Sequence, residues 1–170
     1  VQVVLDERRA RPILIGRPAV IAARIARAGL RFRPGVDVDV IDPESDARYR
    51  DYWTDYQRLM GRHGVTPGMA KAVLRRSTTT IGAMMVRRGD ADAMLCGLVG
   101  RFDVHLGHVR DVIGLKPGAT TLATLNALML PQQTIFVTDT FVNEEPTAEQ
   151  LAEIAAMAAV EVRRFGLPPK

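Results

Sequence analysis

The feature that most constrains the fold is a short apolar run followed at once by a turn and a helical pattern. Residues 11–16 read R-P-I-L-I-G, and an apolar run of this length is typical of a buried parallel strand. Gly16 and Pro18 predict a turn, and Pro18 suits the first turn of a helix that we expect to reach about Ala28, just before Gly29. A strand, a turn and a helix in this order predict an α/β fold.

The alternation of strands and helices continues along the chain. We expect strands at residues 36–41 and 91–96, and helices at about 43–61, 67–75 and 78–88. The second of these strands is predicted to be buried, and Gly97 would then let the chain leave the sheet at its carboxyl edge. Ligand-binding loops are common at such edges.

The irregular stretch after Gly97 is therefore the main functional suspect. Residues 98–107 are the least regular of the chain, and a helical turn follows through Val109, Arg110 and Ile113. Neither G-x-x-x-x-G-K-[ST] nor G-x-G-x-x-G occurs in the chain, so the usual signature of a loop that cradles nucleotide phosphates is missing.

Two arginines next to this stretch suggest another way to hold an anion. Arg101 and Arg110, with backbone N–H groups near Gly97 and Gly100, could form an anion pocket at the end of the strand. Ordinary surface arginines would explain the same pattern equally well.

The C-terminal part has two extended runs and a helix. Residues 121–130 and 134–138 predict paired antiparallel strands, although the first run could equally be helical. Thr147 and Gln150 satisfy the capping-box pattern of a helix that ends at Gly166. The predicted core face of this helix carries Leu151, Ile154, Ala155, Ala158 and Val162.

Composition places the chain among globular proteins. Apolar residues make up 47% and charged residues 25% of the 170 residues, and no stretch has the roughly eighteen uncharged apolar residues of a membrane span. The single cysteine, Cys96, excludes an internal disulfide and fits a reducing compartment, so we expect a cytoplasmic location. Because the sequence begins at Val1, we expect an excised segment.

The net charge of +4 permits an anionic partner, but its distribution argues against nucleic acid. The basic pairs lie at predicted helix ends, where cations complement the helix dipole: Arg8/Arg9, Arg75/Arg76, Arg87/Arg88 and Arg163/Arg164. An aromatic stripe at helical spacing, Tyr49, Tyr52, Trp53 and Tyr56, could stack bases but is more simply a packed or subunit-interface stripe.

Two further features are only weak evidence, one for a metal site and the other for a catalytic thiol. Asp103, His105 and His108 form D-x-H-x-x-H, but no third strong ligand is spaced to match. We therefore predict no metal site and expect the histidines to have a hydrogen-bonded structural or ligand-loop role. Cys96 lies in an apolar run, which favours packing as a small hydrophobe over service as a nucleophile.

Several longer motifs resemble a known family. G-D-A-D-A-M-L-C-G (89–97), H-V-R-D-V-I-G-L-K-P-G (108–118) and T-A-E-Q-L-A-E-I-A (147–155), together with R-P-I-L-I-G-R-P, are similar to the phosphate acetyltransferases and butyryltransferases. Within that family, D-A-R-Y-R-D-Y-W (46–53) and L-M-G-R-H-G-V-T-P (59–67) resemble the C-terminal domain of bacterial hybrid NADP-dependent malic enzymes.

The resemblance implies an α/β/α sandwich of the phosphotransacetylase, isocitrate/isopropylmalate dehydrogenase-like type, with an acyl-CoA cleft between two lobes. Residues 1–125 would form most of the first lobe, and residues 126–170 would begin the second lobe with its dimerisation elements. The expected assembly is a homodimer or a higher homo-oligomer.

The resemblance also marks two departures from the active transferases. Met60, in Met60–Gly64, stands where the family carries an arginine, and Arg62 would have to reach differently to replace it. Arg110 matches a second family arginine, but the loop before it is longer and lacks paired threonines. We expect no catalytic residue in the chain. The candidate ligand-binding residues for acyl-CoA and phosphate are Gly97, Arg101, His105, Arg110, Asn143 and Arg62.

The implied function is regulatory. Acyl transfer to phosphate needs cations to hold the phosphate, so the loss of one would impair turnover more than acyl-CoA binding. We expect an acetyl-CoA-binding domain of a malic enzyme whose NADP and divalent metal, Mg or Mn, bind in an N-terminal domain outside this chain. The alternative is an active phosphate acetyltransferase. The expected partners are the acyl-CoA and further copies of the chain, and we expect neither nucleic acid nor a membrane as a partner.

Overall fold

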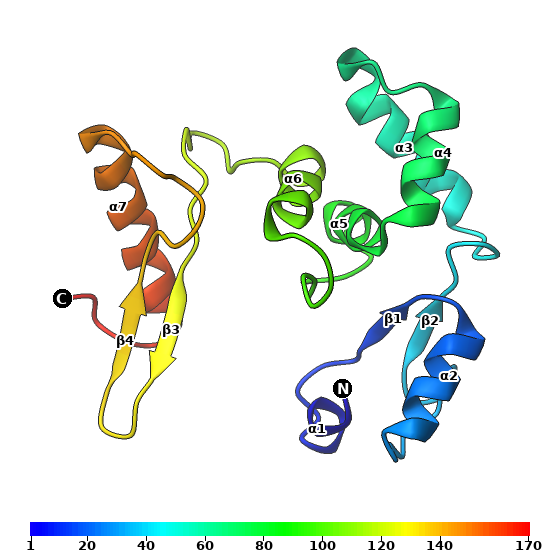
Figure 1. Ribbon diagram of the computed structural model, residues 1–170. Helices are drawn as coiled ribbons and strands as arrows, with labels where there is room; N and C mark the ends of the chain where they lie inside the picture. Colours follow the sequence, from blue (N-terminus) through cyan, green and yellow to red (C-terminus); the bar gives the residue numbers. More distant parts are fainter. The chain divides into compact units, whose positions relative to one another are not determined.

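The computed structural model describes all residues from Val1 to Lys170 and divides into two compact units, Val1–Gly114 and Leu115–Lys170 (Figure 1). Unit 1 contains α1 (Gln2–Asp6), β1 (Ile13–Ile15), α2 (Pro18–Arg27), β2 (Asp39–Ile41), α3 (Tyr49–Met60), the 3-10 turn η1 (Gly61–His63), α4 (Pro67–Arg76), α5 (Thr78–Arg88) and α6 (Phe102–Val112). Unit 2 contains β3 (Asn126–Met129), β4 (Thr134–Val137) and α7 (Ala148–Arg164). The lobe boundary that the sequence suggests, between 125 and 126, stays a prediction.

The first strand, turn and helix form as predicted. β1 and β2 pair in parallel, with Ile13 opposite Asp39 and Ile15 opposite Ile41. Pro18 occupies the first turn of α2, and Gly29, with φ of 61°, lets the chain turn away after the helix. The short parallel pair thus brings two segments far apart in the sequence side by side.

Two predicted elements begin later than expected, because aspartates hold the preceding chain in turns. The Asp37 carboxylate accepts the Arg33 N–H at 2.7 Å, and β2 starts only at Asp39. Asp46 accepts the Arg48 N–H at 2.8 Å, and α3 starts only at Tyr49. Aspartate side chains commonly compete for backbone N–H groups in this way.

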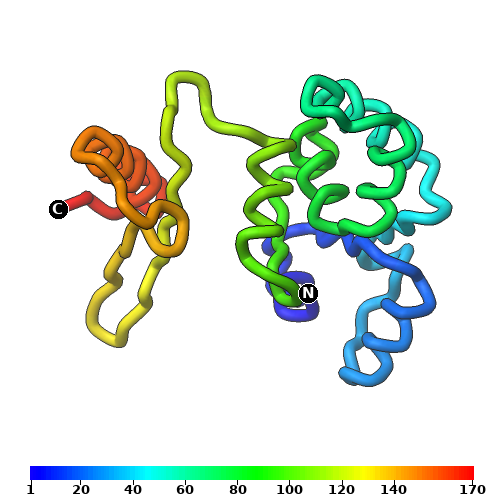
Figure 2. The backbone as a smooth tube through the Cα atoms, turned by 45° about the horizontal axis from the view of Figure 1, so that its top comes forward, coloured from blue at the N-terminus to red at the C-terminus, as the bar shows by residue number.

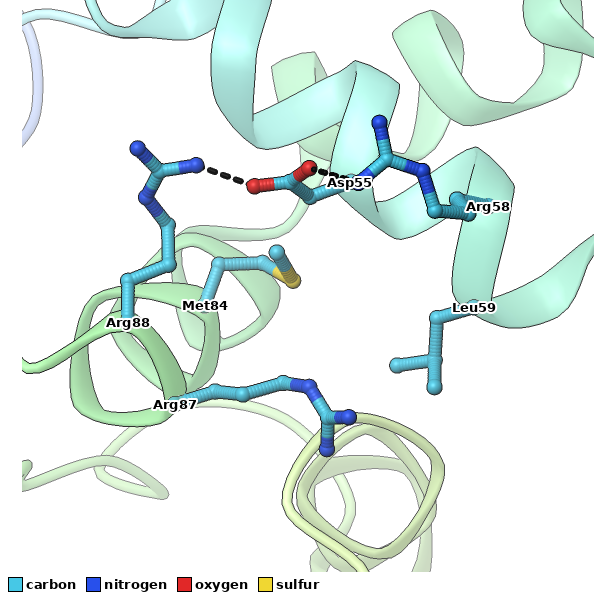
Figure 3. A pocket seen from close by; sticks show the side chains of 6 residues that line it. All are labelled: Asp55, Arg58, Leu59, Met84, Arg87 and Arg88. Carbon is cyan, nitrogen blue, oxygen red and sulfur yellow. Dashed lines mark hydrogen bonds and ion pairs between the residues drawn. The ribbon is translucent and has the colours of Figure 1, made fainter.

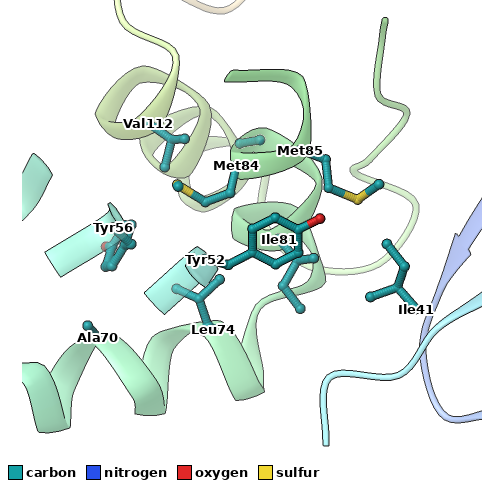
Figure 4. Packing of buried hydrophobic residues seen from close by; sticks show 10 residues of the cluster. Ile41, Tyr52, Tyr56, Ala70, Leu74, Ile81, Met84, Met85 and Val112 are labelled. Carbon is teal, nitrogen blue, oxygen red and sulfur yellow. The ribbon is translucent and has the colours of Figure 1, made fainter. Parts of the chain in front are cut away.

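The aromatic stripe of α3 packs into the core, as the simpler interpretation predicted (Figure 4). Tyr52 and Tyr56 are buried, and Tyr49 and Trp53 lie partly buried against the same cluster. Tyr52 also donates its hydroxyl to Asp90 at 3.1 Å, and burial together with this bond raises the pKa of Tyr52 to about 12. These aromatic faces are therefore used in packing.

Helices α4 and α5 begin and end at the residues that their caps predict. Thr66 and Ser77 cap the two N-termini with their side-chain oxygens, and Gly89 ends α5 in the left-handed conformation. The inner face of α5 carries Ile81, Met84 and Met85, which are almost fully buried. Three of the four basic pairs lie in the last turns of α4, α5 and α7, where the sequence places them.

The strand predicted at residues 91–96 is wrong. β1 pairs only with β2, so the backbone of this segment has no neighbouring strand with which to form a ladder. Ala91 and Met94 lie partly buried against the core, Met94 near Gly82 of α5, whereas Leu95 and Cys96 are exposed. The expectation that Cys96 is buried is therefore wrong as well.

The stretch predicted to be irregular, residues 98–107, is largely helical from Phe102 onward. Asp103 lies in the first turn of α6, where a carboxylate complements the helix dipole. Val112 is fully buried, and α6 lies beside α5 along its length (Figure 2). Packing against α5 stabilises a helix that its interior glycine, Gly107, disfavours.

Unit 2 is an antiparallel hairpin with one helix beside it. β3 and β4 pair with Asn126 opposite Val137 and Met129 opposite Thr134, so the helical alternative for the first run is wrong. Phe136 of β4 lies 5.4 Å, between ring centroids, from Phe165 at the end of α7.

Helix α7 starts at the predicted capping box, in which Thr147 and Gln150 each accept the other's backbone N–H. Its core face is narrower than predicted. Ile154 and Val162 are buried, but Leu151 and Ala155 are exposed because only the hairpin and its flanking loops lie against the helix within unit 2. Across both units, no helix combines the length and apolarity needed to cross a bilayer.

Candidate functional site

The candidate site is the loop from Gly97 to Arg101, together with the start of α6. Gly97 and Gly100 have φ of 99° and 107°, a backbone conformation that other residues rarely adopt. Between them, Leu98 and Val99 are exposed. The loop therefore presents its backbone and two apolar side chains to the outside of unit 1.

His105 holds this loop against α5. Its Nδ1 lies 2.7 Å from the hydroxyl of Thr79, and its Nε2 lies 2.8 Å from the carbonyl oxygen of Val99. A carbonyl only accepts, so Nε2 carries the proton and Nδ1 accepts from Thr79 when the ring is neutral. A Cβ at Gly100 would lie 3.0 Å from Nε2, so the close approach of ring and backbone also favours glycine there.

Arg101 is already paired. Its guanidinium donates to both carboxylate oxygens of Asp103, at 3.0 and 2.7 Å, and this contact lowers the pKa of Asp103. Both side chains are exposed, so solvent weakens the pair. Arg110, near the end of α6, is exposed and forms no ion pair. It is the more available of the two cations.

Met60 and Arg62 differ sharply in their surroundings. Met60 packs against the hydrophobic core at the end of α3, whereas Arg62 in η1 is exposed and has no ion-pair partner. The side chain at position 60 therefore contributes packing, and Arg62 projects from a separate turn.

Asn143 lies in unit 2 and organises a loop there. Its backbone N–H donates to Asp139 at 2.9 Å, and its side-chain amide donates to Asp139 and to the carbonyl of Leu122, the latter at 2.9 Å. Burial opposes the charge of Asp139, but hydrogen bonds from Thr124 and Asn143 outweigh it and lower its pKa. The Asn143 amide is thus engaged in a polar cluster of its own unit.

The structure brings together three of the six candidate residues: Gly97, Arg101 and His105. Arg110 follows on the same helix, Arg62 lies in η1, and Asn143 belongs to the other unit. Sequence reasoning missed Thr79, the buried partner of His105. Its only signal was its place in the S-T-T-T start of α5, which also fits ordinary helix capping.

Comparison with known proteins assigns the family. The model of the family described as "Phosphate acetyl/butaryl transferase" matches residues 1–170. The chain belongs to this family. Among its members, a phosphate acetyltransferase of Nitratidesulfovibrio vulgaris is 30% identical over 158 residues, which are 93% of this chain and 22% of that protein.

Malic enzymes are more similar. The NADP-dependent malic enzyme of Salmonella typhimurium is 50% identical over 161 residues, 95% of this chain and 21% of that enzyme. The NAD-dependent malic enzyme of Rhizobium meliloti is 48% identical over 169 residues, 99% of this chain and 22% of that enzyme. The chain matches the C-terminal region of such enzymes and spans about a fifth of their length.

A solved structure supports the fold. The EutD phosphotransacetylase of Staphylococcus aureus superposes with a TM-score of 0.82 at 20% identity, covering 94% of this chain and 47% of that one. The chain therefore has the α/β phosphotransacetylase fold that the sequence predicted, over about half of that protein's length.

Proposed function

We propose that this chain is the regulatory acetyl-CoA-binding part of an NADP-dependent malic enzyme, which oxidatively decarboxylates malate to pyruvate and CO2. One observation carries the proposal: identity to malic enzymes is 48–50% over nearly the whole chain, against 30% to a phosphate acetyltransferase. The chain in this view belongs to a cytoplasmic homodimer or higher homo-oligomer and uses neither nucleic acid nor a membrane as partner.

The loop site supports ligand binding. Backbone N–H groups around Gly97 and Gly100 and, separately, the exposed guanidinium of Arg110 near the other end of α6 are of the kind that hold phosphates. The exposed side chains of Leu98 and Val99 offer apolar contact to the body of an acyl-CoA. His105 acts as a positioning residue, because both of its ring nitrogens are occupied by protein partners.

Met60 supports binding without turnover. Removal of one oxyanion- or phosphate-stabilising contact commonly costs about 2.7–4 kcal/mol of transition-state stabilisation. Methionine supplies no such contact, and here its side chain packs into the core. The domain would then keep its affinity for acetyl-CoA and lose the ability to transfer the acetyl group.

The coenzyme and metal belong to another part of the whole enzyme. The chain has no G-x-G-x-x-G motif and no group of three His, Cys, Asp or Glu side chains placed to hold Mg²⁺ or Mn²⁺, so its residues do not fit either group. Acetyl-CoA bound here would act on an active site outside this chain. If acetyl-CoA changes the affinity for malate or coenzyme by some factor, then malate or coenzyme must change the affinity for acetyl-CoA by the same factor.

An active phosphate acetyltransferase remains the second candidate, favoured by the exposed cation Arg62 two residues after Met60. One experiment on a complete malic enzyme that carries this chain distinguishes regulation by acetyl-CoA from acetyl transfer to phosphate. Acetyl-CoA should lower the rate of malate oxidation, and the Arg110→Gln variant should need more acetyl-CoA for the same effect than the Arg76→Gln control. Formation of acetyl phosphate from acetyl-CoA and phosphate, without any effect on malate oxidation, would contradict the regulatory function.

A further inference from the structure

A pocket between α3 and α5 lies outside the loop site. It has a volume of about 390 Å³ and is lined by Asp55, Arg58, Leu59, Met84, Arg87 and Arg88 (Figure 3). A volume of this size is within the range of small-molecule sites. The combination of three arginines, one carboxylate and two apolar side chains gives the pocket an amphipathic lining.

The pocket is at the opposite end of α5 from the loop site. Thr79, which binds His105, lies in the first turn of α5, and Arg87 lies in its last turn. Eight residues of helix separate them, which corresponds to about 12 Å along the axis. A ligand in this pocket would therefore occupy a place of its own.

Part of the positive charge of the pocket is already compensated. Asp55 accepts from Arg58 at 3.2 Å and also from Arg88. Arg88 additionally lies 3.4 Å from Asp90 and 3.9 Å from Asp51. Three carboxylates thus surround Arg88, which we regard as structural.

Arg87 is different because it is held in place without being neutralised. Its Nη1 donates to the carbonyl oxygen of Val112 at 2.8 Å, and it forms no ion pair with a carboxylate. The bond fixes the guanidinium at the end of α6 and leaves most of its donors unused. Arg58 shares its only carboxylate with Arg88, and its side chain is 77% exposed.

The apolar part of the lining lies between these charges. In Figure 3, Arg88, Asp55 and Arg58 form one side, Arg87 lies on the other, and Leu59 and Met84 lie between them. We propose that this α3–α5 pocket binds a phosphate monoester with an apolar or aromatic body. Arg87 and Arg58 hold the phosphate dianion, and the body of the ligand contacts Leu59 and Met84. Two incompletely neutralised guanidinium groups match the charge of a dianion better than that of a monoanion.

The test uses phenyl phosphate, benzoate and inorganic phosphate as probes on the full chain, by calorimetry and by the NMR signals of arginine Nε–Hε groups at constant ionic strength. Phenyl phosphate should bind more tightly than benzoate, which has one charge, and than inorganic phosphate, which lacks the apolar body. The Nε–Hε signal of Arg87 should shift as phenyl phosphate binds.

Variants distinguish binding in the pocket from non-specific attraction of the anion to the basic surface. Arg87→Gln should weaken phenyl phosphate binding about tenfold or more, since it removes a charge-assisted contact. Arg58→Gln, on the opposite wall and exposed, should weaken it about two- to fivefold with the fold intact. Arg76→Gln removes an equal charge outside the pocket and should change nothing. Equal losses in Arg58→Gln and Arg76→Gln, no binding of phenyl phosphate, or its displacement by acetyl-CoA would each overturn the proposal.

Discussion

The buried hydroxyl of Thr79 lies 2.7 Å from Nδ1 of His105 and ties the start of α5 to the loop of the candidate site. The other ring nitrogen of His105 binds the carbonyl of Val99 in that loop. One side chain thus connects a rigid helix of the core to the segment that we propose contacts acyl-CoA.

Replacement of Thr79 by valine should loosen the loop. The change keeps the size of the side chain but leaves Nδ1 of His105 without a partner, and such a loss commonly costs about 1–3 kcal/mol. NMR order parameters of the backbone amides from Gly97 to Gly100 should fall, because the loop becomes more mobile. Thr78→Val, at the exposed neighbouring position, is the control and should leave the order parameters unchanged. Equal order parameters in the two variants would show that the loop is held in another way.

Replacement of Leu74 by alanine should destabilise unit 1. Leu74 of α4 is fully buried in the core cluster, and such truncations cost about 2–5 kcal/mol because they remove apolar contacts and leave a cavity. Met69→Ala in the same helix alters a half-exposed side chain and should cost much less. Chemical denaturation measures both free energies of unfolding, and similar losses would contradict the assignment of the core.

Replacement of Thr147 by alanine should weaken the start of α7. The change removes one half of the capping box, and the expected cost is about 1 kcal/mol. Thr147→Ser keeps the hydroxyl and should restore most of the stability. The measurement is the free energy of unfolding together with amide exchange in the first turn of α7. A serine variant as unstable as the alanine variant would contradict the role of the hydroxyl.

Glu153 should make unit 2 sensitive to acid. The hydroxyl and the N–H of Thr120 donate to its carboxylate, at 2.6 and 2.8 Å, and lower the pKa of Glu153 from its usual 4.5 to about 2. Because the pKa of Glu153 is lower in the folded state than in the unfolded state, its contribution to folding stability is complete above about pH 4.5 and is lost as the pH falls toward 2. The difference in melting temperature between the native chain and Glu153→Gln should therefore shrink over this interval. A difference that is constant with pH would show that the charged form of Glu153 has no stabilising role.

The parts of the fold with local signals could be predicted from sequence. Pro18, Ser77, Gly89 and Thr147 begin or end helices through contacts within a few residues, so their effects are visible in the sequence. The strand predicted at 91–96 failed because a strand also needs a neighbour, and no local pattern shows whether one is present.

The candidate site was predictable only in part. The glycines at 97 and 100 directed attention to the segment that we propose as the site, and the family resemblance suggested the ligand that we propose for it. The Thr79–His105 contact joins residues far apart in the chain, and Arg87 looked like one half of a basic pair at a helix end. Both the contact and the position of Arg87 depend on how α5 and α6 pack side by side, and no short motif predicts that packing.

The most direct test of the proposed function is calorimetry of acetyl-CoA with a complete malic enzyme that carries this chain, combined with an assay for acetyl phosphate on the same sample. We predict saturable binding of acetyl-CoA that Arg110→Gln weakens and Arg76→Gln does not, and no acetyl phosphate formed when phosphate is added. Absence of acetyl-CoA binding, or steady turnover to acetyl phosphate, would contradict a regulatory domain that binds the ligand without transforming it.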